Sequence, residues 1–534
     1  MKIALAQFNP VVGDIEGNAA RILDCARRAR EQGAGILLTP ELALCGYPPE
    51  DLLLRTGFNL ACLNTLRSLA QSVTGITVVV GHPDMSGDER YNAASVLQDG
   101  KIVASYHKHK LPNHTVFDEV RYFTPGSTAC VFEADGVKYG VNICADVWHE
   151  EPVTVAREAG AEVLLVLNAS PYHMNKQETR YGVVRERIQE TGMPVIYCNM
   201  VGGQDELVFD GASFVMNSRG EITHQFAAFD DLIGMVEVAG TEPKPGEVEP
   251  QRSLEENVYR ALCLGVKDYV EKNGFPGVEL GLSGGIDSAL TLAVAVDALG
   301  SDRVHAVMMP SQFTADMSLE DAREMAQGLG VRYSEIPIKP MYDEFLNSLA
   351  DEFNDLPFDT TEENIQARIR GTLLMALSNK YGTIVLTTGN KSEMAVGYAT
   401  LYGDMAGGFS VLKDIPKTLV YKLSRYRNGL SSVIPERVIT RAPSAELRAN
   451  QVDQDSLPPY DILDAIMEAY VEHDLCPEEI EAMGYAANDV RRVVTLIDRN
   501  EYKRRQAPVG VRVTARGFGK DRRYPITSRY RPKF

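Results

Sequence analysis

Short apolar segments and longer helix-like segments alternate along the second half of the chain, and this pattern constrains the fold more than any other feature. The short segments, rich in β-branched residues, are typical of buried strands. Strands are predicted at residues 278–282, 303–309, 331–336 and 383–387, and helices at 288–299, 318–329 and 361–380. Alternation of this kind predicts a doubly wound parallel sheet, which binds ligands beyond the carboxyl ends of its strands.

The first 240 residues also mix strand-like and helix-like segments, but two turns indicate antiparallel pairing. Asp99-Gly100 and Ser218-Arg219-Gly220 each join two strand-like runs, as short glycine-containing turns do in β-hairpins. Further buried strands are predicted at residues 3–6, 36–39, 76–80, 139–144, 163–167 and 195–198. We therefore expect an α/β domain in which helices cover sheets with some antiparallel strands.

Residues 240–250, GTEPKPGEVEP, separate these two patterns. Three prolines and two glycines without apolar periodicity are typical of a linker. We predict a first domain at residues 1–240, a linker at 241–251, and a second domain at 252–534 that ends in a basic tail.

A glycine-rich string follows the first strand of the second domain and precedes its first helix. Glycines let the backbone present successive N–H groups to an anion, and the helix adds the positive end of its dipole. Ser288 is placed to cap the helix, and Asp287 to hold Mg²⁺ on phosphates. No lysine follows the glycines, so this is not a Walker A loop; a helix-starting turn without a ligand is the alternative. The string is Gly281, Leu282, Ser283, Gly284, Gly285, Ile286, Asp287 and Ser288.

The segment SGGIDS in this string resembles the pyrophosphate loop of the ATP-pyrophosphatases, which adenylate a carboxylate or carbonyl and release pyrophosphate. Other motifs resemble those of the NAD synthetases: NIQARIR at 364–370, LTTGNKSE at 386–393, Gly403-Asp404, Lys417, KRRQAP at 503–508, and residues 518–526. The resemblance implies that the string and Thr388 bind ATP. It also implies that Asn364, Glu393 and Lys503 bind deamido-NAD, and that Asp287 and Glu393 hold Mg²⁺.

Three reactive residues of the first domain each follow a predicted strand: Glu41, Lys108 and Cys144. A cysteine at a strand-to-helix turn meets helix N–H groups that favour the thiolate. A nearby carboxylate can take its proton, and a lysine can stabilise an oxyanion. Each residue alone has a structural alternative, as a helix-start acid, a surface charge or a small buried side chain. The three together favour a cysteine amidase.

The set resembles the Glu-Lys-Cys site of the nitrilase superfamily over residues 1–240, which implies an αββα sandwich. The resemblance assigns Glu41 as general base, Lys108 as oxyanion support and Cys144 as nucleophile. The pattern Lys-x-x-Leu-Pro selects Lys108 over Lys110. The resemblance also implies that Ala145 N–H completes the oxyanion hole, that Glu119 lies near the site, and that His114, Ser170 and Lys176 contact glutamine. His114 and Ala145 depart from the family, where Tyr and Glu are frequent.

The charge balance excludes some classes of partner. The chain has 54 basic and 73 acidic residues, a net charge of −19, so we expect no nucleic-acid partner and no membrane partner. Residues 501–534 differ, with eleven Lys and Arg against Glu501 and Asp521. This tail is either a solvated basic segment or a phosphate-binding surface, and an anionic dinucleotide substrate favours phosphate binding for residues 503–523.

Cysteine and histidine spacing indicates neither a disulfide scaffold nor a metal site. The eight cysteines form no CxxC pair, and His107, His109 and His114 match no metal-site motif. The first residues show no secretory pattern, and no run of about 18 apolar residues occurs. We therefore expect a cytoplasmic protein.

Together the two resemblances imply an enzyme that releases ammonia from glutamine and uses ATP to convert deamido-NAD to NAD⁺. ATP as substrate and Mg²⁺ as activator are expected, without a prosthetic group, and so is a homo-oligomer. Two alternatives are open: another amidotransferase with the same loop, and an ammonia-dependent synthetase whose first domain only supports assembly. The nitrilase-type site argues against the first, because such enzymes generally use another type of glutaminase, and its intact Glu-Lys-Cys set argues against the second.

Overall fold

The computed structural model describes residues 1–354, 356–449 and 451–530. Contacts divide the chain into two compact units, Met1–Arg252 and Ser253–Phe534, which we call the first and second units. The predicted domain boundaries stay a prediction, and residues 531–534 of the predicted basic tail lie outside the described residues. Within those described ranges, no helix is both long and apolar enough to cross a membrane.

Two mixed sheets and a small hairpin form the centre of the first unit. The larger sheet has the strand order β15-β14-β1-β2-β3-β4-β5 and the smaller one β13-β12-β9-β8-β7-β6. Both predicted hairpins are present, as the antiparallel pairs β4–β5 and β12–β13. The strands of the larger sheet are β1 (Lys2–Gln7), β2 (Ile36–Leu38), β3 (Thr77–Ser86), β4 (Glu89–Gln98), β5 (Lys101–His107), β14 (Leu232–Ala239) and β15 (Glu242–Pro243). The others are β6 (Val131–Ala134), β7 (Val137–Ile143), β8 (Val163–Asn168), β9 (Val195–Asn199), β10 (Val201–Gln204), β11 (Leu207–Asp210), β12 (Phe214–Met216) and β13 (Ile222–Gln225).

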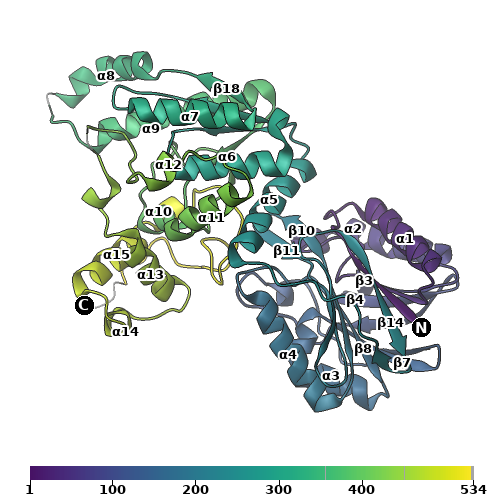
Figure 1. Cartoon of the computed structure of the whole chain (residues 1–534). Helices are drawn as coiled ribbons and strands as arrows, with labels where there is room; N and C mark the ends of the chain where they lie inside the picture. The colour runs from purple at the N-terminus through teal and green to yellow at the C-terminus, as the bar shows by residue number, and fades with distance from the viewer. Residues whose placement is uncertain (355, 450, 531–534) are drawn as a thin grey trace. The chain divides into compact units, whose positions relative to one another are not determined.

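The alternation of side chains along β1 explains the four layers of this unit. Ile3 and Leu5 pack with residues of β7 and β8 in a core between the two sheets, whereas Ala4 and Ala6 face a core formed with α1 and α2. A third core lies between the smaller sheet and α3 and α4. Figure 1 shows the two helix pairs on opposite sides of the sheets, so the predicted αββα sandwich is confirmed. The helices are α1 (Ile15–Glu31), α2 (Thr56–Ser72), α3 (Glu150–Glu158) and α4 (Lys176–Thr191).

The segment predicted as a linker is hydrogen-bonded to the first unit. Strand β15 pairs with β14, and Gly246 N donates to Thr223 O at 3.0 Å. Its many prolines are compatible with this position, because proline is tolerated at sheet edges.

A five-stranded parallel sheet with the order β18-β17-β16-β19-β20 forms the centre of the second unit. The chain runs outward from β16 to β18 and then returns to the other side of β16, so the strand order reverses between β16 and β19. This is the predicted doubly wound topology, and ligands bind at such a reversal. The strands are β16 (Val278–Gly281), β17 (Val304–Met308), β18 (Arg332–Glu335), β19 (Ile384–Thr387) and β20 (Phe409–Ser410).

Helices cover this sheet, and a second helical cluster follows it in the sequence. Helix α6 packs against α5 and α11, and α9 packs over Val307 and Val385 of the sheet. Helices α13, α14 and α15 share their own apolar core, which the sequence did not predict. The larger helices are α5 (Leu254–Lys272), α6 (Ile286–Leu299), α7 (Asp316–Leu329), α8 (Lys339–Phe353), α9 (Thr360–Tyr381), α11 (Lys417–Leu430), α13 (Tyr460–Val471) and α15 (Ala487–Arg499). The shorter ones are α10 (Lys391–Val396), α12 (Glu436–Thr440), α14 (Pro477–Ala482) and α16 (Glu501–Arg504).

Candidate active sites

The fold of the first unit brings the three predicted reactive residues together in its interior. Lys108 Nζ donates to Glu41 Oε1 at 2.7 Å, and Cys144 lies within electrostatic reach of both side chains. Glu41 follows β2, Lys108 follows β5 and Cys144 follows β7, so the three come from the ends of strands in both sheets. All three are buried, so the charges of Lys108 and Glu41 interact with little screening by water.

Two further groups fix the carboxylate of Glu41. Asn92 in β4 donates its Nδ2 to Glu41 Oε1 at 2.7 Å. The backbone N–H of Ala169, directly after β8, donates to the other oxygen at 3.0 Å. With Lys108, these donors leave Glu41 little freedom to rotate, so its orientation toward Cys144 is set before a substrate binds.

Lys108 is shared between Glu41 and a second carboxylate, Glu119. Its ammonium donates to both oxygens of Glu119, at 2.9 and 2.8 Å, and Tyr47 Oη donates to Glu119 Oε1 at 2.9 Å. Burial disfavours the ammonium, but the charges of Glu119 and Glu41 outweigh it and raise the pKa of Lys108. Because its pKa is raised, Lys108 stays charged at neutral pH. Burial, together with the charge of Glu41, raises the pKa of Glu119 to about 7.

Cys144 lies at a strained turn. Its φ of 42° is in the left-handed region, which is costly for a residue with a side chain. Burial raises the pKa of its thiol well above the usual value, and the charge of Glu41 raises it further although Lys108 opposes this. Cys144 begins a short 3₁₀ turn, Cys144–Trp148, but its raised pKa favours the thiol over the thiolate that helix N–H groups were expected to favour.

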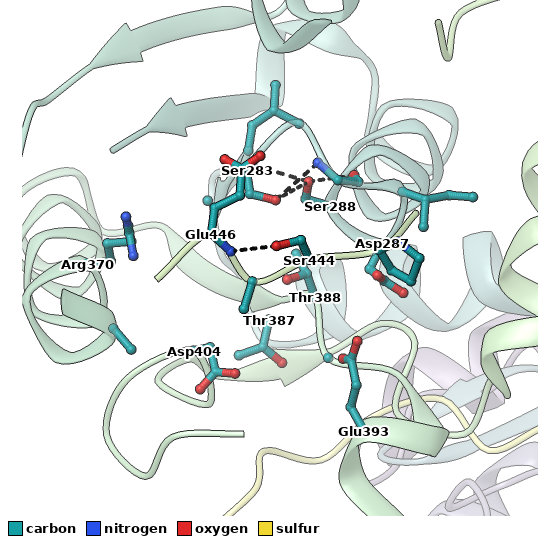
Figure 2. A pocket seen from close by; sticks show the side chains of 18 of the residues that line it. Ser283, Asp287, Ser288, Arg370, Thr387, Thr388, Glu393, Asp404, Ser444 and Glu446 are labelled. Carbon is teal, nitrogen blue, oxygen red and sulfur yellow. Dashed lines mark hydrogen bonds between the residues drawn. The ribbon is translucent and has the colours of Figure 1, made fainter. Parts of the chain in front are cut away.

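The second unit has a cavity of about 270 Å³ where the order of its strands reverses. Figure 2 shows Ser283 and Ser288 together on one wall, with Asp287 and Glu393 to one side and Arg370 on the opposite side. Thr388, directly after β19, also lines it. Of the predicted glycine-rich string, the lining residues are Gly281, Leu282, Ser283, Gly285, Ile286, Asp287 and Ser288.

Hydrogen bonds hold the glycine-rich string in a tight turn. Gly285 N donates to Ser283 Oγ at 3.2 Å, Ser283 N donates to Ser288 Oγ at 3.2 Å, and Ser288 Oγ donates to Gly285 O at 2.9 Å. Ser288 thus fastens the turn from inside α6 and does not cap the helix as predicted, because Gly285 occupies the N-cap position. Gly284 needs to be glycine: its φ is +78°, and a Cβ there would lie 2.5 Å from Ser318 O.

A buried lysine lies between the two carboxylates predicted to hold Mg²⁺. Lys417 Nζ donates to Asp287 Oδ2 and lies 3.5 Å from Glu393 Oε1. Asn390 orients both acids, since its Nδ2 donates to Asp287 Oδ1 at 2.9 Å and its backbone N–H to Glu393 Oε2 at 3.2 Å. Burial, with the charge of Asp287, raises the pKa of Glu393 to about 8. Among the described residues, no group of three or more His, Cys, Asp and Glu side chains forms a metal site.

Comparisons with known proteins identify the family of the chain. The carbon-nitrogen hydrolase family model matches residues 2–240, and the NAD synthase family model matches residues 258–507. The chain is 49% identical to the glutamine-dependent NAD(+) synthetase of Acinetobacter baylyi and 44% identical to that of Thermotoga maritima, over 99% of each chain. This chain belongs to the glutamine-dependent NAD(+) synthetases.

A solved structure of a member of this family supports the same assignment. It is the glutamine-dependent NAD⁺ synthetase of Acinetobacter baumannii in complex with ADP, which is 46% identical and has a TM-score of 0.81. The match covers 100% of this chain and 99% of that chain. The predicted family, with a nitrilase-like domain joined to an NAD synthase domain, is confirmed.

The residues predicted to bind glutamine differ in their environment. Ser170 is buried, and Arg180 donates to its Oγ at 3.2 Å and to its carbonyl oxygen at 2.8 Å. Lys176 begins α4 and places its ammonium 4.2 Å from the ring centre of Trp148. His114 is exposed and packs against Phe117. Their contact with glutamine stays a prediction.

Two residues predicted to bind deamido-NAD lie outside the cavity lining in this member of the family. Lys503 Nζ donates to Gly397 O and Ala399 O, both at 2.8 Å. Asn364 accepts a hydrogen bond of 2.8 Å from Thr400 Oγ1. Both therefore support the segment that follows α10, and Glu393 is the predicted dinucleotide residue that lines the cavity.

Much of the charge in the basic tail is used inside the protein. Arg504 and Arg522 are buried with Glu501, and Arg512 is buried with Asp521. These three guanidinium groups do not form the phosphate-binding surface expected for residues 503–523. Arg370, which is not part of the tail, places a guanidinium at the cavity. Its Nε donates to Met309 O at 2.9 Å. Burial lowers the pKa of Arg370 to about 10, so it stays charged at neutral pH.

Site residues that the sequence analysis did not assign include Asn92, Tyr47, Asp146 and Asn390. Each is a hydrogen-bonding residue that orients a reactive side chain or the backbone beside it. Asn390 lies inside the LTTGNKSE motif, three residues before Glu393, and Asp146 lies two residues after Cys144, so their position was a usable signal. Asn92 and Tyr47 carry no such local signal.

Proposed function

We propose that this chain forms NAD⁺ by amidating deamido-NAD with ammonia taken from glutamine, with one half-reaction in each unit. The observation that carries the proposal is the buried set of Glu41, Lys108, Glu119 and Cys144, in a chain that also holds the glycine-rich cavity. Glutamine, ATP and deamido-NAD are the proposed substrates. Glutamate, AMP and pyrophosphate leave with NAD⁺.

In the first unit, Cys144 Sγ attacks the side-chain amide carbon of glutamine while Glu41 takes the thiol proton. A base is required because burial raises the pKa of Cys144. Lys108 and the backbone N–H of Ala145 stabilise the oxyanion that forms. The proton held by Glu41 goes to the leaving nitrogen, ammonia departs, and a thioester remains on Cys144.

Water then completes the glutaminase reaction. Glu41 takes a proton from water, which attacks the thioester and releases glutamate, and the proton returns to the sulfur. Glu119 supports this cycle indirectly, since it shares Lys108 with Glu41. His114, Ser170 and Lys176 are proposed to bind the glutamine itself.

In the second unit, the carboxylate of deamido-NAD attacks the α-phosphate of ATP, and pyrophosphate leaves. The glycine-rich string and Thr388 hold the ATP phosphates with backbone N–H groups and hydroxyls. Lys417, buried between Asp287 and Glu393, supplies a cation at the same wall. Ammonia then attacks the adenylated carboxylate and displaces AMP.

Asp287 and Glu393 fit a role in holding Mg²⁺. They are two carboxylates that line the same cavity as the glycine-rich string, and Mg²⁺ in nucleotide sites is usually held by one or two carboxylates plus phosphates and water. Mg²⁺ there would neutralise phosphate charge. Asn364, Glu393 and Lys503 are proposed to bind or position deamido-NAD. A homo-oligomeric state and a cytoplasmic location stay predictions.

A product assay tests the proposal. Purified protein is supplied with ATP, Mg²⁺ and deamido-NAD, and NAD⁺ is measured with either glutamine or ammonium as nitrogen donor. We expect NAD⁺ with both donors. An enzyme that uses only ammonium would support the alternative in which the first unit serves assembly alone.

A further inference from the structure

Asp146 is a buried carboxylate whose two oxygens accept four hydrogen bonds. Oδ1 accepts from the backbone N–H groups of His109 and Lys110, at 3.0 and 2.8 Å. Oδ2 accepts from the backbone N–H of Ile143 at 3.0 Å and from Tyr106 Oη at 2.8 Å. Its side chain is fully buried, so water does not replace any of these donors.

These bonds join the two segments that carry Lys108 and Cys144. His109 and Lys110 directly follow Lys108, and Ile143 directly precedes Cys144. The two segments are connected through β6 and β7 and are not neighbours in sequence. The single side chain of Asp146 therefore fixes the backbone that follows Lys108 and the backbone that precedes Cys144.

The backbone groups of Lys108 itself are also hydrogen-bonded. Its backbone N–H donates to Asn92 O at 2.8 Å, and its carbonyl oxygen accepts from Gly126 N at 2.8 Å. The strained φ of Cys144 is held from within its own turn, because Ile143 N–H is bonded to Asp146. Without Asp146, the backbone after Lys108 and the turn at Cys144 would lose their common attachment.

We propose that Asp146 is a positioning residue of the glutaminase site, which sets the Lys108 ammonium against the Cys144 thiol without touching glutamine. The inference rests on the proposed function of that site. A carboxylate is required because each of its two oxygens accepts hydrogen bonds. One oxygen bonds the segment after Lys108, and the other bonds the segment before Cys144. An asparagine offers one acceptor, and its NH₂ group would face at least one N–H donor.

The matched variants are Asp146→Asn and Tyr106→Phe. Asp146→Asn breaks the attachment to one segment, and because a displacement of about 1 Å costs on the order of 100-fold in rate, we expect kcat for glutamine hydrolysis to fall about 100-fold. KM for glutamine should change little, since Asp146 does not contact the substrate. Tyr106→Phe removes one of the four donors and keeps all three backbone bonds, so its kcat should fall much less.

The measurements are made below the onset of each variant's melting transition, followed through the fluorescence of the only tryptophan, Trp148. Ammonium-driven NAD⁺ synthesis by the same preparations is the control for the second unit. Two outcomes overturn the proposal. If fully folded Asp146→Asn keeps both kcat and KM, the residue is merely structural. If it changes KM and leaves kcat intact, Asp146 acts on glutamine binding and not on the positions of Lys108 and Cys144. A wild-type chain that does not hydrolyse glutamine would instead contradict the proposed function.

Discussion

The ammonium of Lys108 lies 2.7 Å from the carboxylate of Glu41, and both side chains are shielded from solvent. Glu119 adds a second carboxylate at 2.8 Å. One buried cation therefore balances two buried acids, and the site depends on that balance both for its charge state and for its stability.

Removing the cation should destabilise the first unit. Lys108→Ala leaves Glu41 and Glu119 without a partner cation, and breaking a buried ion pair typically costs about 3–5 kcal/mol. Adding Glu119→Gln to Lys108→Ala should recover part of that loss, because one uncompensated charge is removed, but should not recover glutamine hydrolysis. Urea unfolding followed by Trp148 fluorescence measures both effects in the first unit. Equal stabilities for the single and double variants would contradict the charge balance.

The raised pKa of Glu119 gives a pH dependence of known sign. Burial and the charge of Glu41 raise this pKa from 4.5 to about 7, so the folded state binds the proton more tightly than the unfolded state. The resulting contribution to the free energy of unfolding is complete below about pH 4.5 and is lost as the pH rises to about 7. The stability difference between wild type and Glu119→Gln should therefore decrease across that interval. A difference that increases with pH would show that Glu119 titrates as an ordinary paired carboxylate.

Asp287→Asn should remove NAD⁺ synthesis with either nitrogen donor while glutamine hydrolysis survives. The variant weakens the bonds to Lys417 and the proposed hold on Mg²⁺ at the cavity wall. Loss of a preorganised charge in such a site typically costs at least about 100-fold in rate. NAD⁺ formation and glutamate release are measured on the same samples. Near-normal synthesis from ammonium would remove Asp287 from the ATP site.

Lys503 lies outside the cavity lining but holds a segment that leads to it. Its ammonium binds the carbonyl oxygens of Gly397 and Ala399, and that segment leads to Thr400 and Asp404, which line the cavity. Lys503→Ala should therefore raise KM for deamido-NAD more than it lowers the melting temperature. Arg505→Ala is the matched control, because Arg505 is an exposed cation of the same run, paired with Glu501. A lower melting temperature with unchanged KM would make Lys503 purely structural.

The sequence predicted the buried strands of both sheets well, because apolar β-branched runs such as that around Leu165 leave few alternatives. It also predicted the glycine-rich string after β16 and Thr388 after β19, since parallel strands bring those ends together. The C-terminal helices were missed because their short segments share one core only after folding. The order of strands, which creates the cavity at β16 and β19, is likewise a property of the whole sheet.

Side-chain environment was harder to predict than position. Asn92 lies 51 residues after Glu41 in the sequence, and Lys417 lies 130 residues after Asp287, so no local motif indicates either hydrogen bond. The sequence also does not show that burial and the charge of Glu41 outweigh Lys108 and raise the pKa of Cys144. The phosphate-binding role of the tail arginines was misjudged because the sequence does not show which of them are buried. Their partners, Glu501 and Asp521, are the only two acids of that segment.

The most direct test of the account is Cys144→Ala, measured with both nitrogen donors. The nucleophile lies in the first unit and the glycine-rich cavity in the second, so the two half-reactions should separate. We predict that NAD⁺ synthesis from glutamine is lost and that synthesis from ammonium stays close to wild type. Glutamine-driven synthesis that persists in Cys144→Ala would contradict the account, because the nitrogen would then have to be released at another site.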